Sequence, residues 1–292
     1  MCAKSLAEDS DVPYAKEIWS RLKEDDSSVV REGNSFFSNL FRNILMSLPS
    51  MVGLKAILEG RYIAVNNALK DEGYPHVLEL ASGLSPRGLD FTRRDSNQIY
   101  IETDLPGLLG IKKGIVEQIR RGEVSKGDTS TPNYHLLPLN VVNRNEFFEA
   151  VKPYADSPRD KPLAIVHAGL WPYLDSEEQR MTRDNIADVL RTYSPNGMWI
   201  TPDIVLNLKE FMSNPIMRFR IRRLEKKTGR KFTFYDSRED AERFLAEGGF
   251  RTEVIPSSNL VDSLTCVKKL GLDVEKVREK SKTYDIHKMK LS

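Results

Sequence analysis

Length, composition and charge restrict the protein to a few classes. The chain has 292 residues, which suits one α/β enzyme with some decoration and allows a large core without disulfide or metal support. Its 44 basic and 42 acidic residues leave a net charge of +2, so no overall field would steer nucleic acid or an acidic membrane toward it. Two widely separated cysteines, Cys2 and Cys266, exclude a disulfide framework and have no metal-binding spacing.

Targeting and membrane signals are weak throughout. The first residues carry acids and no apolar core of a signal peptide. No apolar run approaches the roughly 18 residues needed to cross a bilayer. We therefore expect a soluble, cytoplasmic protein without a membrane partner.

The first 60 residues are typical of helices. Residues 36–48 carry apolar side chains at helical spacing, which predicts a broad core-packing face ended by Pro49. Residues 54–69 are again helix-like and lead into a turn at residues 71–75. We predict an N-terminal helical cap over residues 1–60 and one compact unit over residues 61–292.

After the cap, short apolar runs alternate with amphipathic stretches. Seven runs predict strands, at residues 77–81, 99–104, 133–141, 162–169, 198–204, 251–256 and 283–291. Helices are expected between them, among them one at 108–121, one with Ser176 as its N-cap, and one ending at Gly248–Gly249. This rhythm predicts a mostly parallel seven-stranded sheet flanked by helices on both faces.

Ligands of open parallel sheets bind outside the carboxyl ends of the strands. The first strand end reads LELASGLSPRG, where Glu79 is followed by the small residues Ala81, Ser82 and Gly83. Small side chains let the backbone approach a ligand closely. The turn lacks both the Gly-Lys-Ser/Thr of a P-loop and the three spaced glycines of a dinucleotide site.

The second strand end supplies a carboxylate. Asp104 follows Glu79 after one strand–helix–strand step, where it can accept hydrogen bonds from both ribose hydroxyls of an adenosine. An aspartate before Leu-Pro is also a common start of a turn. Taken in order, the two strand ends indicate a nucleoside ligand without pyrophosphate, which fits S-adenosylmethionine better than NAD.

Several segments of the chain resemble the leucine carboxyl methyltransferase family, which includes O-methyltransferases associated with polyketide biosynthesis. These segments are GRYIAVNNAL, VLELASGLSPRG, YIETDLPGLLGIKKGIV, LLPLNV and AIVHAGLWPYLDSEE. The resemblance implies a Rossmann-like methyltransferase fold, S-adenosylmethionine as cofactor and a small-molecule methyl acceptor.

The resemblance also implies residue roles. Arg61 would grip the cofactor's carboxylate with its two-pronged guanidinium. Asp104 would hold the ribose, and Asn140 would accept a hydrogen bond from the adenine amino group. His167 would lie near the cofactor's ammonium group. The turn after Glu79 would pass under the methionine portion through Ala81, Ser82 and Gly83.

Three positions depart from the family pattern. Ala81 replaces a glycine, which we expect to be tolerated if its φ is negative. Asn140 replaces an aspartate of nearly the same shape. Ala168 replaces an acid, which removes a charge partner of the ammonium group. His167 would substitute for that acid less well, and a hydrogen-bonded core histidine is its alternative interpretation.

The acceptor site is less well marked. His167, Trp171 and Tyr173 are candidates to line it, with residues 36–51 as a candidate lid, while packing of the loop is the alternative for both aromatic residues. A carboxylate acceptor needs no general base, whereas a hydroxyl acceptor would benefit from one. We name no catalytic base and expect no metal, and the sequence leaves the oligomeric state open.

Three functional hypotheses follow. The first is an O-methyltransferase that acts on a carboxylate or hydroxyl of a small molecule. The second is a degenerate member that serves as a non-catalytic binding or scaffolding module. The third is a nucleic-acid methyltransferase using the basic residues 218–231, which also fit a solvated helix face. The balanced net charge and the lack of an Asn-Pro-Pro-Tyr-like motif disfavour this third hypothesis.

Overall fold

The computed structural model describes residues 10–24, 51–124, 133–154, 162–204, 235–281 and 285–292, together with the single residues 7, 222, 225, 229, 231 and 233. A seven-stranded sheet forms its centre in the order β3-β2-β1-β4-β5-β7-β6. The strands are β1 (His76–Leu80), β2 (Ile99–Asp104), β3 (Tyr134–Pro138), β4 (Leu163–His167), β5 (Met198–Thr201), β6 (Phe250–Ile255) and β7 (Ile286–Leu291).

The pairing of the strands confirms the mostly parallel sheet. β3, β2, β1, β4 and β5 pair in parallel, whereas β7 runs antiparallel to both β5 and β6. The second strand has the bounds expected from the sequence, and the others differ by a few residues at their ends. β5 ends at Thr201 rather than at 204, because Pro202 has no N–H to donate to a ladder.

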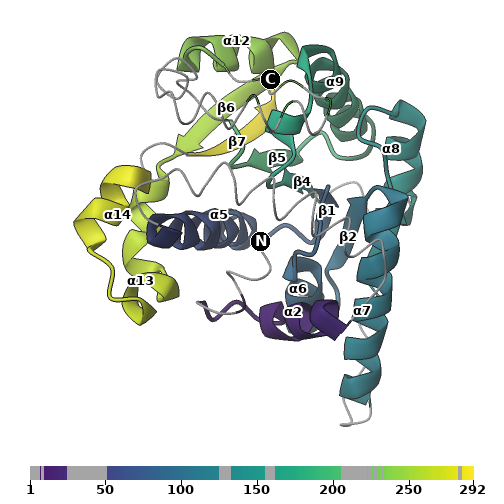
Figure 1. Ribbon diagram of the computed structural model, residues 1–292. Coiled ribbons are helices and arrows are strands. Elements are labelled where there is room, and N and C mark those ends of the chain that lie inside the picture. Colours follow the sequence, from purple (N-terminus) through teal and green to yellow (C-terminus); the bar gives the residue numbers. More distant parts are fainter. Residues whose placement is uncertain are drawn as a thin grey trace.

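Helices cover both faces of the sheet (Figure 1). One layer contains α8 (Arg144–Ala150), α9 (Ser176–Tyr193) and α12 (Arg238–Glu247), and the other contains α2 (Ala15–Glu24), α5 (Met51–Asp71), α6 (Arg87–Arg94) and α7 (Pro106–Val124). Alternate strand residues feed the two cores: Leu78 and Ile165 pack with the first layer, Val77 and Val166 with the second. Burial on both faces explains why these strands read as continuous apolar runs.

A small helical unit connects β6 to β7 and was not predicted. It consists of η4 (Ser257–Ser263), α13 (Thr265–Lys269) and α14 (Val274–Ser281), and it lies beside α5 (Figure 1). Ala56 of α5 joins its separate apolar cluster. The buried Glu59 of α5 accepts hydrogen bonds from the backbone N–H groups of Thr265 at 3.0 Å and Cys266 at 2.8 Å. A side chain of one helix therefore caps the first turn of another.

Two helix ends test the capping predictions. α12 ends at Glu247, with Gly248 as C-cap and Gly249 at φ +84°, as expected. The prediction of Ser176 as the N-cap of α9 is wrong by one residue. Asp175 caps the helix because Glu178 stands three residues later, and the two residues exchange side chain-to-backbone hydrogen bonds in a capping box.

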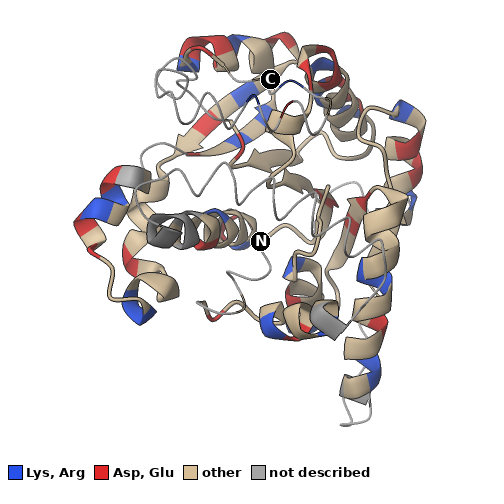
Figure 2. Cartoon of the chain, viewed as in Figure 1, with Lys and Arg blue, Asp and Glu red and all other residues tan. Residues whose placement is uncertain are grey.

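Other predictions fall partly outside the described residues. The helix predicted at 36–48 lies outside them, as does the candidate lid at 36–51 apart from residue 51. Most of the basic stretch 218–231 also lies outside them, although Arg222 is described and exposed. α5 continues through residue 60, where we divided the cap from the main unit, so that boundary stays a prediction. On helices such as α9, α12 and α14, Lys and Arg are mixed with Asp and Glu (Figure 2).

Candidate functional site

The carboxyl ends of the parallel strands meet at one edge of the sheet. Glu79 on β1 is in register with Glu102 on β2, and Leu80 is in register with His167 on β4. The residues that follow these strands are therefore neighbours, although the sequence separates them widely. This edge is where ligands of open α/β sheets bind.

The turn after β1 has an unusual backbone. Gly83 has φ +55°, and no heavy atom lies within 4 Å of the position that a Cβ would occupy. The N–H of Ser82 donates to the carbonyl of Thr103 at 2.8 Å, which ties the turn to β2. The condition under which we expected Ala81 to be tolerated, a negative φ, is not met, because its φ is 48°. A left-handed conformation costs an L-residue with a Cβ about 1–2 kcal/mol.

Asp104 joins the turn to the end of β2. Its Oδ2 accepts a hydrogen bond from the N–H of Gly83 at 2.8 Å, and its Oδ1 accepts one from the N–H of Leu105 at 2.8 Å. Burial raises the pKa of Asp104, while these two N–H groups oppose the rise. Since each carboxylate oxygen can accept about two hydrogen bonds, both oxygens keep an acceptor site for ligand hydroxyls.

Glu79 is engaged inside the protein. Its carboxylate forms an ion pair with the buried Arg87 of α6 and accepts a hydrogen bond from the hydroxyl of Tyr100 at 2.7 Å. Arg87 also donates from Nε to the side-chain oxygen of Asn66 at 2.6 Å, which fixes it to α5. Glu79 is only 2% exposed, so a ligand could contact it directly only if the packing around it opened.

A second buried ion pair joins Glu102 of the neighbouring strand β2 to Lys112 of α7. Lys112 of α7 places its Nζ 2.5 Å from a carboxylate oxygen of Glu102 and 3.1 Å from the Oγ of Ser82. Burial raises the pKa of Glu102 even though Lys112 opposes the rise. The sequence interpretation missed this pair. The available signal was Lys112 at helical spacing with Leu109 and Val116, on the face of α7 that packs on the sheet.

Asp203, just beyond β5, is the centre of a further network that the sequence interpretation missed. Its carboxylate forms an ion pair with Arg61 of α5 and lies 2.9 Å from Nδ1 of His167. The N–H of Gly169 donates to it at 2.7 Å, and the N–H of Leu170 donates at 2.8 Å. Burial alone would raise the pKa of Asp203, but Arg61 and His167 hold that pKa well below its usual range. A charged residue at a strand end, in the motif Thr-Pro-Asp, was the available signal.

The three acceptor-site candidates have different surroundings. His167 is fully buried, and its Nε2 has no hydrogen-bond partner among the described residues. The Trp171 ring stacks on His167 with 5.5 Å between ring centroids, and its Nε1 donates to the hydroxyl of Tyr235 at 3.1 Å. Trp171 thus packs in the aromatic core, which is the alternative role that we gave it beside lining the acceptor site. Tyr173 is half-buried, and burial raises its pKa, with the negative charge of Asp203 adding to the rise.

Asn140 lies beyond the end of β3 and is exposed. Its backbone N–H donates to the carboxylate of Glu146 at 2.6 Å, and its side-chain oxygen lies 3.4 Å from the N–H of Val142. That second contact is long for an N–H···O bond, so the oxygen remains available to a ligand. The adenine contact of Asn140 stays a prediction.

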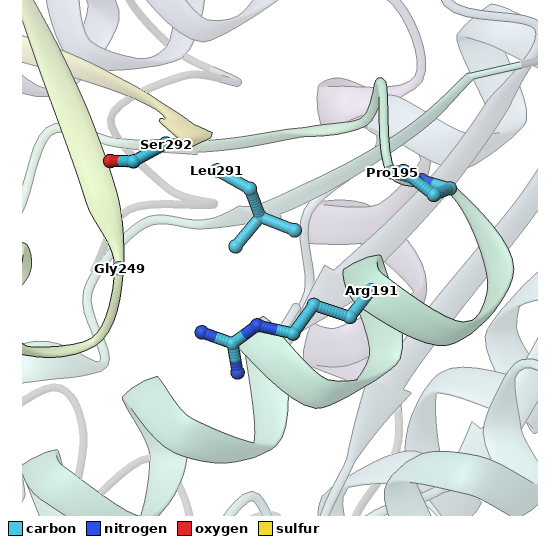
Figure 3. Close-up of a pocket in the computed structure, with 5 residues that line it drawn as sticks. All are labelled: Arg191, Pro195, Gly249, Leu291 and Ser292. Atoms are coloured by element: carbon cyan, nitrogen blue, oxygen red, sulfur yellow. The ribbon is translucent and has the colours of Figure 1, made fainter.

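One open pocket of about 320 Å³ lies elsewhere, lined by Arg191, Pro195, Gly249, Leu291 and Ser292 (Figure 3). Pro195 precedes β5 and Gly249 precedes β6, so the pocket lies at the amino ends of these strands, opposite the strand ends described above. The Arg191 guanidinium there donates to the carbonyl of Gly248 at 2.9 Å. Within the described parts of the chain, no group of three or more His, Cys, Asp or Glu residues could hold a metal ion.

Comparison with known proteins defines the class of fold. No family model and no curated protein matches the sequence. A DUF574 family protein from Streptomyces avermitilis matches the structure with a TM-score of 0.59 and 13% identity, over 99% of this chain and 100% of that one. A candidate methyltransferase from Thermobifida fusca matches with a TM-score of 0.56 and 15% identity, over 98% and 96%.

A third similar structure is the methyltransferase domain of bacterial CtHen1, with a TM-score of 0.50 and 14% identity, over 81% of this chain and 99% of that domain. The chain therefore has the Rossmann-like methyltransferase fold, with the strand order and the antiparallel β7 described above. The resemblance to leucine carboxyl methyltransferases in particular stays a prediction. None of the described helices is both long and apolar enough to span a membrane.

Proposed function

We propose that the protein is an S-adenosylmethionine-dependent methyltransferase, and specifically an O-methyltransferase of a small molecule with a carboxylate or hydroxyl acceptor. The observation that carries the proposal is the junction of Gly83 and Asp104. An open glycine turn and a carboxylate with spare acceptor sites lie side by side at the edge of a methyltransferase-type sheet.

The described residues fit the cofactor in several places. Asp104 would accept hydrogen bonds from the ribose hydroxyls, and the turn at Ser82 and Gly83 would lie under the methionine portion, where a larger side chain would obstruct it. Asn140 would receive the adenine amino group. Arg61 would bind the methionine carboxylate. When bound, the cofactor supplies an electrophilic methyl group.

The protein's own contribution is mainly positioning. Aligning an acceptor with the methyl group and excluding water supply most of what such a displacement requires. Tyr173, which follows β4 and is half-buried, is the candidate to line the acceptor site. His167, which ends β4, is fully buried and could reach an acceptor only if its surroundings opened. A carboxylate acceptor would need no base, so the proposal requires no further side chain for it.

A non-catalytic binding module is the second candidate function. Ala168 removes an acid from the cofactor's ammonium side, and Ala81 places a Cβ in a turn whose φ favours glycine. Both features argue against catalysis with this cofactor, but neither argues against the methyltransferase fold. The cytoplasmic location expected from the sequence remains part of the proposal, and a nucleic-acid substrate is not favoured.

Calorimetric titration with S-adenosylmethionine and S-adenosylhomocysteine tests the proposal. We expect micromolar binding, about 8 kcal/mol, and a loss of about 1.5–3 kcal/mol in Asp104→Ala, the scale of a hydrogen bond to a charged group. Asp188→Ala, on the exposed side of α9, is the matched control and should bind normally. Absence of binding at millimolar ligand would refute the cofactor assignment. Tight binding without transfer to carboxylic acids or phenols would favour the binding module.

A further inference from the structure

Asp203 has more hydrogen-bond donors around it than a carboxylate can fully use. The donors are the Arg61 guanidinium, Nδ1 of His167 and the backbone N–H groups of Gly169, Leu170 and Trp171. Two carboxylate oxygens offer about four acceptor sites. Asp203 is also buried, with a fully inaccessible side chain. It therefore has no capacity to bind a ligand itself, and its effect must pass through its partners.

Arg61 has the opposite character. Its side chain is 17% exposed, and its contact with Asp203 uses one end of a guanidinium that carries five N–H donors. It makes no other hydrogen bond or ion pair that the described residues show. A half-buried guanidinium with spare donors, held at one end, is suited to two-pronged recognition of a carboxylate.

The position of this pair is also informative. Gly169 and Leu170 follow β4, and Asp203 follows β5, so the pair lies at the edge of the sheet that carries Asp104 and Gly83. The Asp203 carboxylate holds the loop after β4 through the backbone N–H groups of that loop, and it holds α5 through the Arg61 side chain. It supplies a negative charge next to position 168, where the sequence has alanine instead of an acid.

We propose that Asp203 is the positioning residue for the amino-acid end of the ligand: it fixes the Arg61 guanidinium and the loop at residues 169–171 so that the free donors of Arg61 receive an α-amino acid carboxylate. This inference rests on the proposed function and deepens it. Because Asp203 stays ionised far below neutral pH, it holds Arg61 in place over the whole physiological range.

The test uses two ligands that share the nucleoside but differ at the amino-acid end. S-adenosylhomocysteine carries the carboxylate, whereas 5′-methylthioadenosine lacks it. Calorimetry is run on the wild type, Arg61→Gln, Asp203→Asn and the double variant, with Asp188→Asn as a matched surface control. Thermal unfolding of each variant reports whether it is folded.

We expect Arg61→Gln and Asp203→Asn each to weaken S-adenosylhomocysteine by about tenfold or more, the scale of a lost charged hydrogen bond, and to leave 5′-methylthioadenosine unchanged. In the double variant, Asp203→Asn should add nothing to Arg61→Gln, because it acts through that arginine.

Three results would overturn the inference and leave the nucleoside site standing. They are equal weakening of both ligands by Asp203→Asn, additive losses in the double variant, and wild-type affinity for S-adenosylhomocysteine in Arg61→Gln. The last result decides the matter even if Asp203→Asn does not fold. Wild-type protein that binds neither ligand would overturn the proposed function together with the inference.

Discussion

Replacing Ala81 by glycine should stabilise the protein slightly, against the usual direction of an alanine-to-glycine change. Ala81 has φ 48°, where a Cβ costs about 1–2 kcal/mol. Glycine removes that cost, but it also raises the conformational entropy of the unfolded chain, which destabilises the folded state by about 0.4–1 kcal/mol. Loss of one partly buried methyl group removes a few tenths of a kcal/mol more. The net expectation is a gain of about 0.5 kcal/mol.

Ala246→Gly is the matched control. It removes the same methyl group, but from an exposed residue whose backbone is helical. It should destabilise the protein by about 0.5–1 kcal/mol. Urea unfolding followed by tryptophan fluorescence should therefore separate the two variants by about 1–1.5 kcal/mol at equal m-values. Equal destabilisation by both changes would refute the conclusion that the turn at Ala81 is strained.

Three further predictions concern the buried polar groups. Lys112→Met should cost about 3 kcal/mol in urea unfolding by leaving Glu102 unpaired, and adding Glu102→Gln should recover part of that loss; no recovery would contradict the pairing. Glu59→Gln should cost about 2 kcal/mol, because its carboxylate accepts from both the N–H and the hydroxyl of Thr265; an unchanged urea midpoint would argue against the cap. Burial lowers the pKa of His287 from 6.5 to about 4, so its contribution to stability is present above pH 6.5 and is lost as pH falls toward 4. His287→Asn should reduce the fall in the free energy of unfolding between pH 6.5 and about pH 4 by about 3 kcal/mol at most. An unchanged fall would exclude His287 as its source.

The fold was accessible from the sequence because its signals are local. Apolar runs buried on both faces marked the central strands β1, β2, β4 and β5, and the β2 range was correct to the residue. The edge strands β3 and β6, which are only partly buried, were found from their apolar residues and the turns around them. The N-cap of α9 was misplaced because Asp175 and Ser176 are both good caps, and only Glu178 decides between them. The short α13 was missed because five residues cannot show a helical period.

Site residues could be predicted from the sequence only where they lie at the carboxyl end of a strand. Ala81 and Asp104 directly follow or end strands, so the rule for carboxyl ends finds them. The same rule points to Asp203, which was missed, but it does not predict the partners of that residue, because Arg61 lies 142 residues away and His167 lies 36 residues away. The backbone strain at Ala81 was also hidden, since φ is set by the path of the chain from β1 to Asp104 and not by the local sequence.

Two residues within one turn of helix α5 hold contacts in different parts of the molecule, so the helix links those parts mechanically. Glu59 caps α13 in the helical unit after β6, and Arg61, two residues later, pairs with Asp203 at the strand ends. Because an α-helix turns as a stiff rod over so short a distance, a restraint on Arg61 also restrains Glu59. We therefore expect a ligand held by Arg61 at the strand ends to slow hydrogen exchange at the capped amides of Thr265 and Cys266, in the helical unit between β6 and β7.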